Sequence, residues 1–161
     1  MGEEDLTIDL ESLIAAARAE FDEAEPQDVD VLLGAELVKV RLWPLAPQAW
    51  RVLYADNPVR MKVVDGERVE RPSDVPYGCD IDTVVREYPR VALVQSDDVK
   101  ELDRATWKRI VDVLPLDGLQ GVMATIAYMN IAEPAQRLVE ALGKAVLGEG
   151  QTKPASPDSS E

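Results

Sequence analysis

The first apolar pattern along the chain has the spacing of a helix. Between residues 8 and 23, apolar residues recur at i, i+3, i+4, i+7 and i+11, at positions Leu10, Leu13, Ile14, Ala17 and Phe21. This spacing places them on one side of a helix, which Pro26 ends. We expect the stripe to pack on its own domain, with docking on a partner as the alternative.

Residues 29–43 change to the period of a strand. Apolar side chains alternate with Lys39 and Arg41, as they do in a strand with one buried face. Gly34 stands where the chain would turn back, so the segment predicts a β-hairpin. Proline is favoured in the first turn of a helix, and Pro47 therefore predicts a helix that carries Trp50.

The middle of the chain is less regular. Asp65-Gly66 is a turn signal that makes a second small hairpin possible. A short helix is expected to begin near Asp80 and to end before Pro89. The apolar run 91–94 fits either a strand or a helical continuation, because its period does not decide between them.

Helical spacing returns in the C-terminal half. One helix begins near Trp107, a second follows Asp117, and a last one opens at Glu133-Pro134 and is expected to end at Gly148 and Gly150. Residues 148–161 are polar and rich in proline and serine, a composition typical of disorder.

These elements together predict a mainly α fold with one or two small β-hairpins (α+β), arranged as a single compact helical domain. The domain would cover residues 8–147, with its N-terminal hairpin at about 29–43. A flexible acidic segment, residues 1–7, would precede it, and a disordered polar tail, residues 148–161, would follow it.

The charge of the chain argues against two classes of binding partner, nucleic acids and anionic membranes. The formal net charge is −14, and such a surface repels nucleic-acid phosphates and anionic membranes. A generally acidic host proteome would produce the same charge. The N-terminus lacks the basic region of a signal peptide, and no apolar run has the roughly 18 residues of a membrane span. We therefore expect a cytoplasmic protein without nucleic-acid or membrane partners.

The sequence also offers little for catalysis. It contains no histidine, and its single cysteine, Cys79, excludes an intramolecular disulfide and a thiolate metal cluster. Asp80 with Asp82 and Asp97 with Asp98 are carboxylate pairs, which would need a shared pocket to bind a metal or cleave a glycoside. We expect Cys79 to be a partly buried bystander. No catalytic residue, cofactor site or metal site is predicted, so the chain reads as a non-enzyme.

Partner-binding candidates come from the apolar stripes and from large side chains favoured at binding hot spots. Tryptophans and methionines are more often core anchors, and that alternative stays open for each of them. The candidate partner-binding residues are Leu10, Leu13, Ile14, Ala17, Trp50, Trp107, Met123 and Met129.

The order of these features resembles the tail assembly chaperones of long-tailed (siphovirus-type) bacteriophages, over roughly residues 10–147. The resemblance rests on the acidic first helix, the segment VLLGAELVKVRLW, and the proline-led helix with Trp50 that closes at Asp56-Asn57-Pro58. It continues with Tyr77-Gly78-Cys79-Asp80, with Trp107 at a helix start, and with a helix that ends near Asn130.

The resemblance implies a non-enzymatic assembly factor in the host cytoplasm that is not retained in the virion. Its partners would be the tape-measure protein, which it keeps soluble, and the major tail-tube protein, which it helps recruit. Self-association is possible. The family commonly makes a longer product by ribosomal frameshifting, and Gly143-Lys144 could be encoded by a slippery GGG-AAA core.

Two other classes remain open. The first is a structural virion component such as a head-tail connector or tail completion protein, which would form rings and stay in the particle. The second is an enzyme that uses clustered carboxylates and a divalent metal, for which Asp80 and Asp82 would be the ligands.

Overall fold

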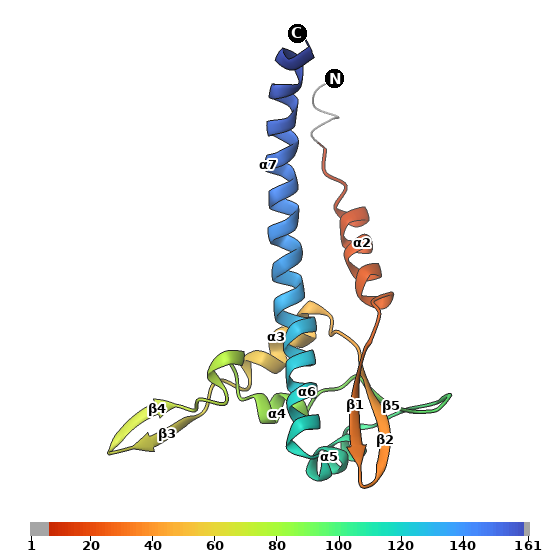
Figure 1. Cartoon of the computed structure of the whole chain (residues 1–161), viewed down its shortest axis with the longest axis vertical. Coiled ribbons are helices and arrows are strands. Elements are labelled where there is room, and N and C mark those ends of the chain that lie inside the picture. The colour runs from red at the N-terminus through yellow and green to blue at the C-terminus, as the bar shows by residue number, and fades with distance from the viewer. Residues whose placement is uncertain (1–6, 160–161) are drawn as a thin grey trace.

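A β-sheet with short helices forms the base of the molecule, and two helices rise from it side by side (Figure 1). The structure is a computed structural model that describes residues 7–159, with side chains described as far as Leu147. The predicted flexible segment 1–7 therefore lies outside the described residues except for Thr7. The taller of the two rising helices is the C-terminal one.

The sheet has four antiparallel strands in the order β1-β2-β5-β6. The strands are β1 (Gln27–Leu33), β2 (Glu36–Leu42), β5 (Val91–Gln95) and β6 (Asp98–Glu101). The hairpin predicted at 29–43 is thus β1 and β2, which turn at Gly34 with a φ of 63°. Strand β2 continues the sheet by pairing with β5, where Val40 is opposite Leu93.

The predicted mainly α class is wrong. The chain is about 52% helical and 22% strand, with a four-stranded antiparallel sheet and a two-stranded sheet, which is an α+β fold. The error arises at residues 91–94, which form all but the last residue of β5. A strand buried on both faces reads as a continuous apolar run without alternation, so its sequence hides the pairing that joins the hairpin into a larger sheet.

Helix α6 (Leu116–Ala127) lies across one face of β1 and β2. Helix α4 (Ile81–Arg86) packs beside α6, and α5 (Arg104–Val113) packs against α4. Residues from the strands and from these helices form one apolar core. The most deeply buried aliphatic members are Leu42, Val40, Ile81, Val84, Val85, Val122 and Ile126.

Three polar contacts join the end of the sheet to the helices. The Tyr88 hydroxyl donates a hydrogen bond to the Trp43 carbonyl at 2.6 Å and accepts one from the Asn130 amide at 2.9 Å. The Leu45 N–H in turn donates to Asn130 Oδ1 at 3.0 Å. On the other side of the core, Trp107 Nε1 donates to the Val85 carbonyl at 2.6 Å. These bonds satisfy groups that would otherwise be buried without a partner.

The second predicted hairpin is also present. Strands β3 (Met61–Val64) and β4 (Glu67–Glu70) pair antiparallel, and they project from the base with every residue exposed (Figure 1). Asp65 and Gly66 both have positive φ, as a type I′ turn requires. Helix α3 (Pro47–Ala55) precedes this hairpin, and the short helix η1 (Val75–Tyr77) follows it.

Helix α6 continues through a π-helical turn, η2 (Tyr128–Ala132), into α7 (Glu133–Ser159). The backbone of α7 passes Gly148 and Gly150, where the sequence predicts its end. Side chains beyond Leu147 are not described, and the predicted disorder of residues 148–161 stays a prediction. The other rising helix is α2 (Leu10–Asp22), whose N-cap Asp9 accepts a hydrogen bond from the Ser12 N–H at 3.1 Å.

We predict that Gly78→Ala destabilises the protein more than Gly34→Ala. Both glycines have positive φ, which costs an alanine about 1–2 kcal/mol. A Cβ at Gly34 meets nothing within 4 Å, whereas a Cβ at Gly78 would lie 2.4 Å from the Tyr54 hydroxyl. Urea unfolding of the two variants measures the difference. Equal losses would show that the Tyr54 ring moves aside without cost.

Candidate partner-binding surface

The apolar stripe of α2 is exposed. Leu13 is 60% exposed, and Leu10, Ile14 and Ala17 are exposed with it. None of the residues of α2 is buried. The expectation that this stripe packs on its own domain is therefore not met. At the C-terminal end of α2, Phe21 is half-buried.

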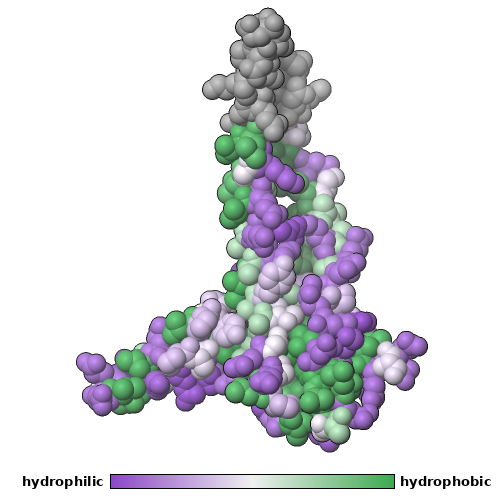
Figure 2. Space-filling model, viewed as in Figure 1, coloured by the Kyte–Doolittle hydropathy of each residue, from purple (hydrophilic) through white to green (hydrophobic). Residues whose placement is uncertain are grey.

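A second exposed stripe lies on α7. Leu142 is 58% exposed, and Leu138, Val139 and Val146 are exposed to a similar degree. At 3.6 residues per turn these four side chains fall within a band about 100° wide on one side of the helix. Figure 2 shows apolar surface along the edge of the α7 arm that faces away from α2. Ile131 extends this α7 stripe to the base of the arm.

An ion pair between Glu20 and Arg137 joins the two rising helices. Arg137 lies about 140° around the helix from Leu142, so α2 approaches α7 from its polar side. The ion pair is exposed. The arrangement holds α2 beside α7 while it leaves both apolar stripes uncovered.

A groove continues the α7 stripe into the base of the molecule. It measures about 530 Å³ and lies between η1 and the segment in which α6 joins η2. Its walls include Val75 and Pro76 on one side and Ala127, Tyr128 and Ile131 on the other. The apolar surface is therefore continuous from this groove along α7.

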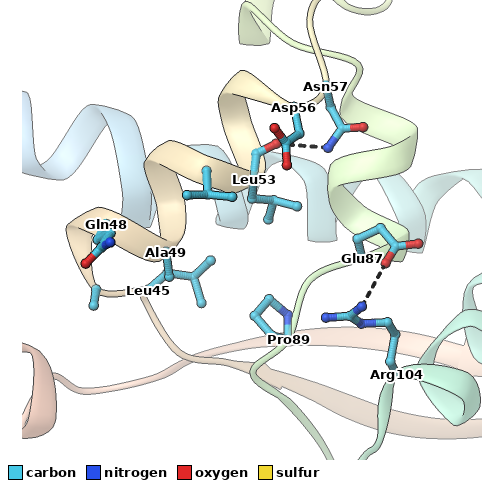
Figure 3. Close-up of a pocket in the computed structure, with 11 residues that line it drawn as sticks. Leu45, Gln48, Ala49, Leu53, Asp56, Asn57, Glu87, Pro89 and Arg104 are labelled. Atoms are coloured by element: carbon cyan, nitrogen blue, oxygen red, sulfur yellow. Dashed lines mark hydrogen bonds and ion pairs between the residues drawn. The ribbon is translucent and has the colours of Figure 1, made fainter.

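A larger groove of about 680 Å³ runs beneath α3 (Figure 3). Apolar side chains such as Leu45 and Leu53 line it, and Pro89 closes the opposite wall. At its far end Glu87 pairs with Arg104 at 3.4 Å. The groove is open and has an ion pair but no convergent set of polar groups, so it offers a contact surface rather than a reaction site.

The remaining candidate side chains lie mostly in the core. Trp107 is 1% exposed and Met129 is buried, while Met123 packs against the core from its edge. Trp50 is half-buried and stacks at a tilt on Tyr54, with 5.7 Å between ring centroids. Trp107 and Met129 thus anchor the core, and among the aromatic and methionine candidates only Trp50 and Met123 keep some exposed surface.

Asp80 and Asp82, which the sequence offered as possible metal ligands, both contact an arginine. Arg60 reaches Asp80 at 3.0 Å and Asp82 at 3.0 Å, and it makes two short hydrogen bonds, of 2.8 and 2.7 Å, to Asp74. The guanidinium occupies the position that a cation would need. Within the described residues no group of three or more metal-ligating side chains is placed to hold an ion.

Asp74 is the residue that sequence reasoning missed. Its side chain is fully buried, and it also accepts hydrogen bonds from the Arg60 and Ile81 N–H groups. These bonds, above all those from the Arg60 guanidinium, hold the pKa of Asp74 below its ordinary value. No sequence signal separates this aspartate from the other acidic residues of the chain.

Cys79 is fully buried, which raises the pKa of its thiol to about 11. At neutral pH the thiol is therefore protonated, and the thiolate is the reactive form. Cys79 is thus buried more deeply than the partly buried position expected for it.

Comparison with protein-family models, with curated proteins and with solved structures finds no match. Among the described helices, none has both the length and the apolar character needed to cross a bilayer. The assignment of function therefore depends on the surface itself.

We predict that Asp74→Asn lowers the free energy of unfolding by about 3 kcal/mol at pH 7, because it breaks a buried ion pair. It should also change the response to acid. A carboxyl whose pKa is lower in the folded chain contributes stability above its unfolded pKa of about 4, and this is lost as the pH falls through the folded pKa.

Urea unfolding between pH 2 and pH 7 measures both effects. The wild type should lose more stability below about pH 4 than Asp74→Asn does. Asp98→Asn, at an exposed position on β6, is the matched control and should follow the wild type. An unchanged acid slope in Asp74→Asn would contradict the role of the Arg60 pair.

Proposed function

We propose that this protein is a tail assembly chaperone that binds an apolar helical client along α2 and α7. The observation that carries the proposal is the pair of exposed apolar stripes on two helices that stand clear of the core. Soluble proteins rarely expose apolar surface of this extent unless it binds something. The proposal describes a binding protein, not an enzyme.

An amphipathic client helix would fit such a surface. Helix-in-groove recognition uses apolar anchors at i, i+3, i+4 and i+7, and both α2 and α7 present that spacing. The groove beside Ile131 would receive side chains at one end of the client. The molecule as a whole has a net charge of −14, which would raise the solubility of the complex.

The resemblance to phage tail assembly chaperones supports a specific client. A tape-measure protein is long, helical and apolar. Its apolar surface must be shielded from water until the tail tube assembles around it. In this proposal the chain holds the tape-measure protein in the host cytoplasm and helps recruit the major tail-tube protein. Many weak contacts along a long client would be released one after another as tube subunits replace them.

Co-expression tests client binding. We expect the chain to keep the tape-measure protein of an actinobacterial long-tailed phage soluble, because its apolar helices would be covered. The double variant Leu13→Glu with Leu142→Glu should keep less than half as much of the client soluble as the wild type does. Gln136→Glu, on the polar side of α7, is the control and should retain it. The soluble fraction of the client after centrifugation measures the outcome.

These substitutions are at exposed positions, where changes usually alter stability by less than about 0.5 kcal/mol. Loss of binding would therefore not reflect loss of folding, which circular dichroism checks. Equal solubilisation by the double variant and the wild type would exclude α2 and α7 as the client surface.

Intact-mass analysis of products made from the gene with its native downstream DNA tests the phage assignment separately. We expect the 17.7 kDa chain and a longer product that shares its N-terminus, because the related chaperones commonly frameshift. The slip would map near Gly143-Lys144. A single product would place the structural virion component on nearly equal terms with the chaperone, because not every related chaperone frameshifts.

A further inference from the structure

The tip of the β3–β4 hairpin is an Asp-Gly dipeptide, Asp65-Gly66, and the chain contains one other, Asp117-Gly118, at the start of α6. In this dipeptide the side-chain carboxyl of the aspartate is close to the backbone nitrogen of the glycine, which has no side chain to shield it. Attack between groups held so close within one molecule is strongly favoured over the same reaction between separate molecules. The two dipeptides have opposite surroundings, and this difference decides which of them reacts.

The hairpin tip leaves Asp65-Gly66 free to move. The strand pairing ends at Val64 and Glu67, and every residue of both strands is exposed. A Cβ at Gly66 would meet nothing within 4 Å, and the Asp65 carboxylate forms no hydrogen bond or ion pair with any residue that the structure describes. Loop tips with so few contacts change conformation readily. The peptide unit between Asp65 and Gly66 can therefore rotate until its nitrogen faces the Asp65 carboxyl.

The dipeptide in α6 is held in place. Gly118 is buried, and a Cβ there would lie 3.0 Å from Val31 Cγ1. The helix also fixes the backbone dihedrals of Asp117, and contact with β1 opposes rotation of the peptide unit that follows it. The second dipeptide is thus an internal control with the same two residues.

We propose that Asp65 is a site of spontaneous isomerisation, at which the Gly66 nitrogen attacks the Asp65 side-chain carboxyl and isoaspartate results. A bond forms between this nitrogen and Asp65 Cγ, and the carboxyl hydroxyl leaves with the amide proton as water, which gives a five-membered succinimide. Water then adds to the former backbone carbonyl carbon of Asp65 and breaks its bond to nitrogen. The main chain now runs through Cβ and Cγ, the former backbone carbonyl becomes a free α-carboxylate, and the atomic composition is unchanged.

The free α-carboxylate makes the hairpin tip a substrate for a class of enzyme. A carboxyl methyltransferase that uses S-adenosylmethionine transfers a methyl group from the sulfonium of the cofactor to an oxygen of this carboxylate, and a methyl ester forms. The tip projects from the base of the molecule (Figure 1), so the group is accessible in the folded chain. An ordinary residue inside a chain has no such α-carboxylate.

Isomerisation also changes the hairpin itself. Asp65 and Gly66 both have positive φ, as a two-residue type I′ turn requires, and isoaspartate adds one atom to the backbone of that turn. The hairpin is marginally stable as a two-stranded unit and buries no residue in the core, so it should open. At its base the Arg71 N–H donates to the Arg60 carbonyl at 2.9 Å, and the Arg60 side chain is bound to Asp74. The opening should therefore stop at Arg60 and leave the core intact.

Peptide mapping of the aged full chain tests the proposal. After several weeks in warm neutral buffer, trypsin separates the two dipeptides into peptides 63–68 and 110–137. An isoaspartate-specific methyltransferase with labelled S-adenosylmethionine is then the probe. We expect label in peptide 63–68, several times more than in peptide 110–137 and several times more than in freshly purified protein. Equal label in the two peptides, or none in 63–68, would overturn the proposal.

Two matched variants assign the signal. Asp65→Glu lengthens the side chain by one carbon, so that closure needs a six-membered ring and is slower, and this variant should lose the label. Asp117→Glu should retain it. Label that persists in peptide 63–68 of Asp65→Glu would contradict an origin at Asp65.

Hydrogen exchange measures the effect on the fold. Amides of the aged hairpin should exchange faster than in fresh protein, while those of β2 and α6 should be unchanged. Unchanged exchange at the hairpin in protein that carries the label would overturn the proposed opening. The proposal goes beyond the proposed function, because none of these results depends on a phage or on a client.

Discussion

Close contact between α6 and β1 sets the direction of the arm on which the exposed α7 stripe lies. A Cβ at Gly118 would come within 3.0 Å of Val31 Cγ1, and one at Gly121 within 3.0 Å of Val29 Cγ1. The two glycines therefore let the helix lie directly on the strand. Because α6 continues without a loop into η2 and α7, the angle fixed at this contact is carried along the whole arm.

The polar contacts at η2 hold the arm at its root. Asn130 is in the π-helical turn, and its amide joins Tyr88 on one side and Leu45 on the other. Desolvation raises the pKa of the Tyr88 phenol, so the hydroxyl stays protonated and continues to donate to the Trp43 carbonyl. A π-helical turn is rare and often marks a functional position, and here it lies where the core ends and the exposed α7 stripe begins.

Several elements of this fold could be read from the sequence. The Gly34 and Asp65-Gly66 turns were predictable because positive φ restricts them to a few residue types. Strand β5 was not, since a strand buried on both faces loses the alternation that marks it. Asp74 was also hidden, because its role depends on Arg60, fourteen residues away, and local spacing says nothing about that contact.

The stripes themselves were predictable, but their exposure was not. An apolar stripe with helical spacing has the same sequence pattern whether it packs on its own core, on a client or on a second copy. For Leu10, Leu13 and Ile14, only the three-dimensional position of α2 shows that no core residue covers them.

The exposed apolar helices and the high net charge have opposite effects on the tendency of the molecule to associate. The stripes favour association through the hydrophobic effect, and a net charge of −14 opposes it by repulsion between molecules. Association is then favoured where apolar surface coincides with local charge balance. The α7 segment with Glu133, Arg137, Glu140 and Lys144 meets both conditions, whereas α2, which carries Glu11, Glu20 and Asp22 against Arg18 alone, does not.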